Sequence, residues 1–438
     1  METTTEVIAE TAAQPAASNV LAGAEAPRVP RFPPPALRVR PFRWYWAAQW
    51  PVLLGMWMQV VALGYFVFQV TGSQTAVGVV AACQGLPAIV FPLAGGVVAD
   101  RVPRRRILLV TQSILGVSSC SLAVVAFSGH ASLAAIALVA FVFGSADSVD
   151  LPTRQALIGD LVDRELVVSA VALGSVTMST CRIIGPSIAG LLLATVGPGA
   201  CFLALGLAYI VPISVLLTVI PDIKPLPRRA GSSPMGDIAA GLRLALHDPM
   251  VRLLVISAAT LSFLGVAYMP YLPVLAKTAL HGDARVLGLM YSTGGVGGLA
   301  AGLIIASLGR GSTRVRMLVG GGVIYAFSLF TLSHAQLLGV ALPALVGVSF
   351  GFLAMNTSMT TLLQTETDPA MRGRLLGIYT MILAGLQPLG TLFYGLVGHV
   401  VPLFDAIGVG ALVVGVVAVV AGTRAPLRNI GSLHPATR

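Results

Sequence analysis

Long apolar segments divide this sequence, and they constrain its fold more than any other feature does. Each runs for roughly 18 to 25 residues, and a helix of that length, rising about 1.5 Å per residue, spans a hydrocarbon core about 30 Å thick. The 438-residue chain is 56% hydrophobic and only 10% charged, which leaves too little polar surface to cover a soluble globule. The sequence therefore predicts an all-α membrane protein.

Twelve such segments are expected, and a polar stretch divides them into six and six. Their approximate ranges are 44–70, 75–98, 107–128, 132–151, 166–194, 199–220, 251–276, 286–308, 315–333, 336–357, 374–398 and 403–423. We expect residues 1–41 to form a disordered tail, because they are rich in Ala, Pro and Thr and lack the features of a signal peptide. A first six-helix bundle then covers 42–220, a central loop 221–249, a second bundle 250–424 and a C-terminal tail 425–438.

The distribution of positive charge predicts how the chain is oriented. With both termini inside, all but three of the 27 Lys and Arg lie on the cytoplasmic side, and the exceptions are Arg182, Lys277 and Arg285. This positive-inside pattern predicts a multi-pass protein of the bacterial plasma membrane with both termini in the cytoplasm. The net charge of +10 thus reflects orientation and not binding to nucleic acid. The four cysteines lie within spans and lack paired spacing, so we expect neither a disulfide nor a metal site, and no cofactor.

The two halves of the chain resemble each other. The charged segment 96–106 between the second and third spans has a counterpart in 302–316, between the eighth and ninth, at an offset of about 206 residues. Gly185-Pro186 has a counterpart in Gln387-Pro388. In many secondary transporters, two such repeats enclose a site near the bilayer midplane and expose it alternately to either side.

One of these segments carries a recognisable pattern. This segment resembles the loop motif that the major facilitator superfamily places between its second and third spans. It reads Gly96-x-x-x-Asp100-Arg101-x-x-Arg104-Arg105. Segments 152–156 and 182–190 are similar to the prokaryotic exporter branch that includes the enterobactin and macrolide exporters. One departure is Pro103, where the general pattern has Gly. The resemblance covers nearly all of 42–423 and implies the major facilitator fold, with twelve transmembrane helices in two six-helix bundles related by a pseudo-twofold axis.

Asp100 is expected at the cytoplasmic end of the second span, where it would face the N-terminus of the eleventh span near Arg372–Leu375. Unpaired N–H groups and the helix dipole favour an anion at that position. Gly96, which has no side chain, would let the two helices approach closely. We expect this contact to hold the two halves together on the cytoplasmic side.

Further charged residues extend the predicted contact between the halves. Asp150, at the inner end of the fourth span, is a candidate partner for Arg101 or Arg104, and Arg105 belongs to the same motif. Breaking these contacts would open the cavity to the cytoplasm. Alternatively, the arginines only set the orientation of the chain in the membrane.

Acidic residues within spans are rare, and they are the first candidates for proton coupling. Apart from Asp405 at the outer edge of the last span, only Asp147 and Asp150 lie within predicted spans. Either would carry the proton if transport is proton-coupled. Alternatively, both residues cap or pair structurally near a helix end.

The fifth span holds two further candidates. Arg182 is the one basic residue deep in a predicted span, so it either attracts an anionic substrate or extends along the helix to bond water or carbonyl groups. Gly185-Pro186 with Gly190 resembles the antiporter motif of exporters in the superfamily. Because proline removes a helix hydrogen bond and glycine permits close packing, a bend here would seal the outer mouth, unless it is an ordinary transmembrane kink.

Polar residues within spans of both halves are candidates for the wall of a mixed apolar and polar substrate cavity, although each alone also fits a helix-packing hydrogen bond. They are Gln59, Tyr65, Gln84, Gln112, Tyr268, Tyr271, Asn356 and Gln387, with Arg182 beside them. Such a cavity suits amphipathic molecules better than sugars.

Together these features predict a secondary transporter and not an enzyme. The Gly347–Gly351 segment matches the G-x-S-x-G pattern of hydrolases, but it lies inside a span, and no phosphate-binding loop for ATP is present. We expect a proton-driven exporter of drug-like or siderophore-like molecules, whose partners are that substrate, membrane lipids and protons. The alternatives are a lipid or lysolipid translocator, or a non-transporting membrane receptor with this fold.

Overall fold

The computed structural model describes residues 34–89, 91, 102–222, 243, 247–307 and 313–424, and every regular element within these ranges is a helix. Eleven of the helices are long and apolar enough to cross a membrane, and a shorter apolar helix is described over Gln74–Ile89. This confirms the all-α membrane fold. The predicted motif residues Gly96, Asp100 and Arg101 lie outside the described residues.

The first half of the chain forms one bundle. Its helices are α1 (Arg40–Thr71), α2 (Gln74–Gly85), α4 (Arg104–Ser128), α5 (Leu133–Leu161), α6 (Val167–Thr195), α7 (Pro198–Ala208) and α8 (Ile210–Thr218), with the short turns η2 (Pro35–Arg38) and η3 (Arg164–Leu166). Helices α7 and α8 together make one span. The hydroxyl groups of Ser73 and Ser132 accept backbone N–H groups at the starts of α2 and α5, which satisfies donors that a helix start leaves unpaired.

The second half forms the other bundle. Its elements are α10 (Pro249–Thr260), η4 (Leu261–Gly265), η5 (Val266–Tyr271), α11 (Leu272–Thr278), α12 (Ala284–Ser307), α13 (Thr313–Ser333), α14 (Leu338–Thr365), α15 (Pro369–Val397) and α16 (Leu403–Thr423). The span from α10 to α11 is irregular, because η4 is a π-helical turn and η5 is a 3-10 stretch that contains Pro270. The Tyr394 hydroxyl donates to the Leu264 carbonyl at 2.8 Å and so satisfies a backbone group in this irregular stretch.

Several boundaries differ from the sequence expectation; α14, for example, continues to Thr365, past the predicted end at 357. The predicted tail extends to residue 41, whereas α1 begins at Arg40 and the preceding turn η2 fully buries Ala36. Helix α5 continues to Leu161, well past the predicted end near 151, because Leu157 and Leu161 are buried in a hydrophobic cluster with Phe42. The polar sequence that follows Pro152 therefore still has one apolar face, and that face keeps it helical.

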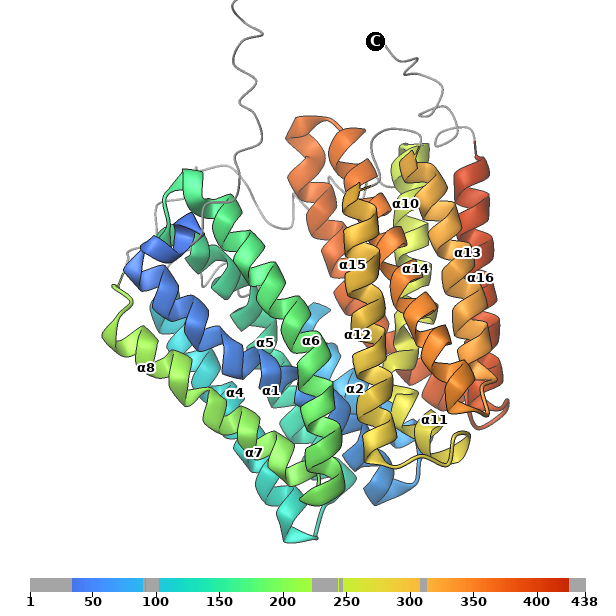
Figure 1. The fold of residues 1–438 in the computed structure, drawn as a ribbon, viewed down its shortest axis with the longest axis horizontal. Coiled ribbons are helices and arrows are strands. Elements are labelled where there is room, and N and C mark those ends of the chain that lie inside the picture. Colours follow the sequence, from blue (N-terminus) through green and yellow to red (C-terminus); the bar gives the residue numbers. More distant parts are fainter. Residues whose placement is uncertain are drawn as a thin grey trace, which may run out of the picture.

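The two bundles meet mainly along two helix pairs: α6 packs against α12, and α2 packs against α15, while α1 also contacts η5 and α11. We call the side on which α1 begins and α16 ends the terminal face, and the other side the opposite face. Figure 1 shows the blue-to-green bundle and the yellow-to-red bundle diverging toward the terminal face and converging toward the opposite face. The space between the halves is thus widest at the terminal face.

Candidate functional site

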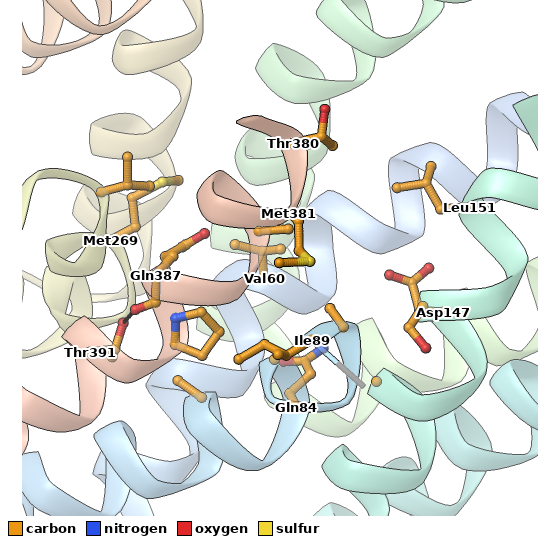
Figure 2. Close-up of a pocket in the computed structure, with 18 of the residues that line it drawn as sticks. Val60, Gln84, Ile89, Asp147, Leu151, Met269, Thr380, Met381, Gln387 and Thr391 are labelled. Atoms are coloured by element: carbon orange, nitrogen blue, oxygen red, sulfur yellow. Dashed lines mark hydrogen bonds between the residues drawn. The ribbon is translucent and has the colours of Figure 1, made fainter. Parts of the chain in front are cut away.

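A cavity of about 1130 Å³ lies between the two bundles. Its walls come from α1, α2 and α5 of the first half and from η5 and α15 of the second. Apolar side chains such as Val60, Ile89 and Met381 dominate the lining, with a few polar groups among them, as Figure 2 shows. A cavity of this size and character holds a drug-sized molecule.

The cavity opens toward the terminal face. Leu151 and Gln155 on the last turns of α5 line it, as do Gly373 and Arg374 on the first turns of α15. Both of these helix ends lie at the terminal face. Deeper in the cavity, the lining includes Val77 on α2 and Thr391 on α15.

The crossing of α6 and α12 closes one side near the opposite face. A Cβ atom built on Gly288 would lie 2.8 Å from the Cα of Gly190 and 2.8 Å from the Pro186 carbonyl oxygen, so the two backbones touch. The hydroxyl groups of Ser187 and Ser292 lie 2.7 Å apart across the same crossing. Glycine at both positions is what permits this approach.

The contact between α2 and α15 closes the other side. The Thr75 hydroxyl donates to the Gly395 carbonyl at 2.7 Å, and its oxygen lies 2.7 Å from Nε2 of His399. Because a hydroxyl has only one proton to donate, His399 is the donor in the second contact. The Tyr271 hydroxyl donates to the Thr391 carbonyl at 2.6 Å within the second half and stiffens α15 at this level.

Asp147 on α5 is the acidic residue of the cavity wall, and Figure 2 shows its carboxylate pointing into the open space. Its Oδ1 atom lies 3.8 Å from Nη2 of Arg154 and accepts no hydrogen bond within the part of the chain that the structure describes. Gln84 of α2 and Gln387 of α15 line the same cavity. Oδ1 itself is buried, and the exposed third of the Asp147 side chain is the part that a proton or a ligand can reach from the cavity.

Behind Asp147, a buried charged cluster joins α1, α4 and α5. Asp150 is fully buried, and its Oδ2 atom lies 2.6 Å from Nε of Arg154. The Thr111 hydroxyl donates to Oδ1 of Asp150 at 2.7 Å, and Arg154 donates to the Gln49 side chain at 3.3 Å. Arg154 is thus committed mainly to Asp150, and one arginine balances two aspartates.

The predicted pairing of Asp150 with Arg104 is wrong. Arg104 forms an ion pair with Asp160 and donates to the Ala156 carbonyl at 3.3 Å, whereas Asp150 pairs with Arg154. The physical reason is that α5 continues past Pro152, which places Arg154 one turn after Asp150 on the same buried face.

The remaining residues of the predicted loop contact were Gly96, Asp100 and Arg101, and all three lie outside the described residues. Arg105 is described, and its guanidinium donates to the Leu216 and Leu217 carbonyls at the end of α8. This contact lies within the first half, where basic groups stabilise a helix C-terminus.

Of the polar residues predicted for the cavity, Gln84 and Gln387 line it. The others pack elsewhere: Gln59 beside Ser119, Gln112 buried near Asp150, Asn356 accepting from Tyr379, Tyr271 against α15, Tyr268 buried within the second half, and Tyr65 at a small pocket near the opposite face. Most of these polar side chains bond other helices, which is the alternative that the sequence left open.

Arg182 does not line the cavity. Its guanidinium carbon lies 5.4 Å from the ring centroid of Trp57, a cation–π contact, and it is the Trp57 side chain that reaches the cavity wall. In the same helix, a Cβ on Gly185 would lie 2.7 Å from the Cβ of Trp57, so Gly185 packs against α1 while Gly190 packs against α12.

Sequence reasoning missed several wall residues, among them Trp57, Met269 and Met381. They are apolar residues among many apolar residues, and only their place in the fold distinguishes them. It also missed the buried Arg154, although this residue stood inside a recognised segment, because the expected end of the helix near 151 put it in a loop.

Comparisons with known proteins identify similar membrane transporters. A family model described as "Transmembrane secretion effector" matches residues 32–438. The Staphyloferrin A transporter of Staphylococcus aureus is 25% identical over 381 residues, which cover 86% of this chain and 94% of that protein. The enterobactin exporter EntS of Escherichia coli is 29% identical over 384 residues, which cover 83% and 89%.

Solved structures share the fold. The crystal structure of the nucleoside transporter NupG superposes with a TM-score of 0.67 at 15% identity and covers 87% of this chain and 97% of that one. A bacterial homolog of the human lysosomal transporter Spinster, in an inward-facing and unoccupied conformation, gives a TM-score of 0.69 at 13% identity, with coverage of 91% and 99%. At such identities the likeness establishes the architecture alone.

Proposed function

The chain belongs to the transmembrane secretion effector family and is a membrane transporter of the major facilitator type, and we propose that it exports small drug-like or siderophore-like molecules in exchange for protons. The observation that carries this proposal is a cavity between two bundles that opens at one face, is closed at the other and has an acidic side chain on its wall.

The cavity opens at one face and is closed at the other, and this supports alternating access as the mechanism. With both termini in the cytoplasm, as the positive charges predict, the terminal face is the cytoplasmic face, and the open cavity is ready to load from the cell interior. Release then requires α6 to part from α12 and α2 from α15 at the opposite face. The Gly185, Pro186 and Gly190 positions lie where that movement occurs.

Closure at the terminal face is the complementary step. We propose that Gly96 and Asp100 approach the start of α15 when that face closes, as the loop motif implies. Arg105, through its bonds to the end of α8, would hold the loop against the first bundle during this movement.

Asp147 is the proposed proton carrier. Its carboxylate reaches the cavity, whereas Asp150 is fully buried and paired with Arg154. A carrier must meet the aqueous cavity in order to exchange its proton. Asp150 and Arg154 then act as the fixed partners that keep Asp147 in place.

Everted membrane vesicles test the proposal. Candidate compounds are added after a pH gradient is imposed, and the wild-type protein is expected to dissipate the gradient when a substrate is present. Asp147→Asn keeps the shape of the side chain but cannot carry a proton, so the substrate-dependent signal should fall to background. Asp405→Asn, at the start of α16 and away from the cavity, is the matched control and should keep full activity. Unchanged proton-linked flux in Asp147→Asn would refute the role of Asp147.

A further inference from the structure

We infer that the substrate is a lipophilic cation, an apolar body carrying one positive charge, and that this charge pairs with Asp147. The inference rests on the proposed function and names the substrate class of the same cavity. It separates such molecules from chelators rich in carboxylate or catecholate groups.

The charge of the wall is the first argument. Among the described residues that line the cavity, only Asp147 and Arg374 are charged. Arg374 lies on the first turns of α15, at the mouth, and its Nη1 atom contacts the Met371 sulfur at 3.4 Å. Deeper in the cavity, the wall therefore presents a single charge, and that charge is negative.

The buried cluster does not cancel this charge. Arg154 lies 2.6 Å from Asp150 but 3.8 Å from Asp147, and the three side chains together sum to one negative charge. Within the low dielectric of a membrane protein, an unbalanced carboxylate attracts a cation and repels an anion more strongly than it does in water. Oδ1 of Asp147 is buried and turned toward Arg154, and the exposed part of the side chain, 31% of its surface, is what a ligand in the cavity can reach.

Arg182 does not reverse the balance at the cavity surface. Its guanidinium faces the Trp57 ring at 5.4 Å and is absent from the cavity lining. An anionic substrate would thus meet the indole and not the arginine. The negative face of an aromatic ring itself favours cations.

The rest of the wall fits an apolar body. Val60, Leu63 and Ile89 of the first half face Met269 and Met381 of the second, and methionine adapts to irregular apolar shapes. Below the mouth, where Arg374 lies, the charge of the wall comes from the first half, since the positions about 206 residues after Asp147 and Asp150 hold the uncharged Leu353 and Asn356. The cation therefore has one binding partner, on α5.

A pair of ions with opposite charge and nearly equal shape tests the inference. Tetraphenylphosphonium and tetraphenylborate are titrated by calorimetry into the purified full chain in lipid nanodiscs, and the signal of empty nanodiscs is subtracted. We expect the phosphonium to bind at least about tenfold more tightly than the borate. Asp147→Asn should remove this difference, Asp147→Glu should retain it, and Asp405→Asn should leave it unchanged.

Several outcomes would overturn the inference. Equal or tighter binding of the borate would do so, and so would a phosphonium preference that persists in Asp147→Asn. Asp147→Glu keeps the test decisive if the asparagine variant is not monodisperse, because loss of the preference in a folded variant that retains the charge also contradicts the pairing.

The experiments distinguish a failure of this inference from a failure of the proposed export function. Proton-linked flux in vesicles together with preferred binding of the borate leaves the exporter proposal standing and removes the cation inference. Phosphonium binding that depends on Asp147, without flux of any compound, supports the binding partner and refutes export.

Discussion

The crossing of Gly190 and Gly288 offers the sharpest test of alternating access, because the structure indicates what a larger side chain would meet there. Replacing Gly288 by Val adds a branched side chain at a point where α12 touches α6. The added Cβ would lie 2.8 Å from the Gly190 Cα and 2.8 Å from the Pro186 carbonyl oxygen. Both are backbone atoms and cannot rotate away, so the helices must part.

The expected size of the effect follows from that overlap. Forcing extra atoms into a packed contact costs about 1–3 kcal/mol. The cost falls only on the conformation that is closed at the opposite face, because the two helices separate when that face opens. A bias of about 1–3 kcal/mol changes the ratio of two conformations about 5- to 150-fold. Gly288→Val should therefore populate the state that opens at the opposite face.

Distances between spin labels measure this shift. One pair of labels, at His130 and Leu337, reports on the opposite face, and a second pair, at Glu165 and Glu366, reports on the terminal face. The labels require a background in which serine replaces the free cysteines Cys83, Cys120, Cys181 and Cys201. In Gly288→Val, the first distance should lengthen and the second should shorten relative to the parent protein.

Gly298→Val is the matched control, since it makes the same replacement on the same helix. A Cβ on Gly298 meets no atom within 4 Å, so both distances should stay as in the parent. Identical distributions for the Gly288 and Gly298 variants would refute the idea that this crossing controls access. Gly288→Ala, which adds one methyl group, should give an intermediate shift.

Two further predictions concern polar contacts. Ser187→Ala removes one hydroxyl from the Ser187–Ser292 pair that bridges the halves, a net loss of about 0.5–1.5 kcal/mol. The same spin labels should therefore report a shift in the same direction as Gly288→Val but smaller. A shift toward closure of the opposite face would contradict this. Arg154→Ala leaves Asp150 fully buried without its partner, which should cost about 3–5 kcal/mol and lower the melting temperature of the purified protein. Arg104→Ala is the control, because the ion pair between Arg104 and Asp160 is partly exposed and should contribute about 1 kcal/mol or less to stability. An equal fall in melting temperature in both variants would contradict the argument.

The chain of apolar segments was sufficient to predict the helices, because a spanning helix must satisfy all of its backbone groups within itself and needs a minimum apolar length. The predicted segment 403–423 coincides with α16 (Leu403–Thr423), and the predicted segment 315–333 differs from α13 only at its start. Where prediction failed, as at the end of α5, polar sequence continued as a helix because one of its faces was buried against another helix.

The site was predicted less completely. Asp147 stood out in the sequence because a carboxylate within a span is costly, and it does reach the cavity. Arg182 stood out for the same reason, yet it faces Trp57 and not the cavity. The sequence indicates that a charged residue lies within a span, but the direction in which its side chain points depends on the rotation of that helix against its neighbours.

Sequence alone determined the medium, the helical class and the number of apolar segments, since these follow from composition and length along the chain. Only the tertiary structure decided that Asp150 binds Arg154 and not Arg104, and that Gly190 meets Gly288 across the two halves. Those contacts join residues through the packing angle and rotation of whole helices, and such quantities are set by many side chains at once and by no local pattern.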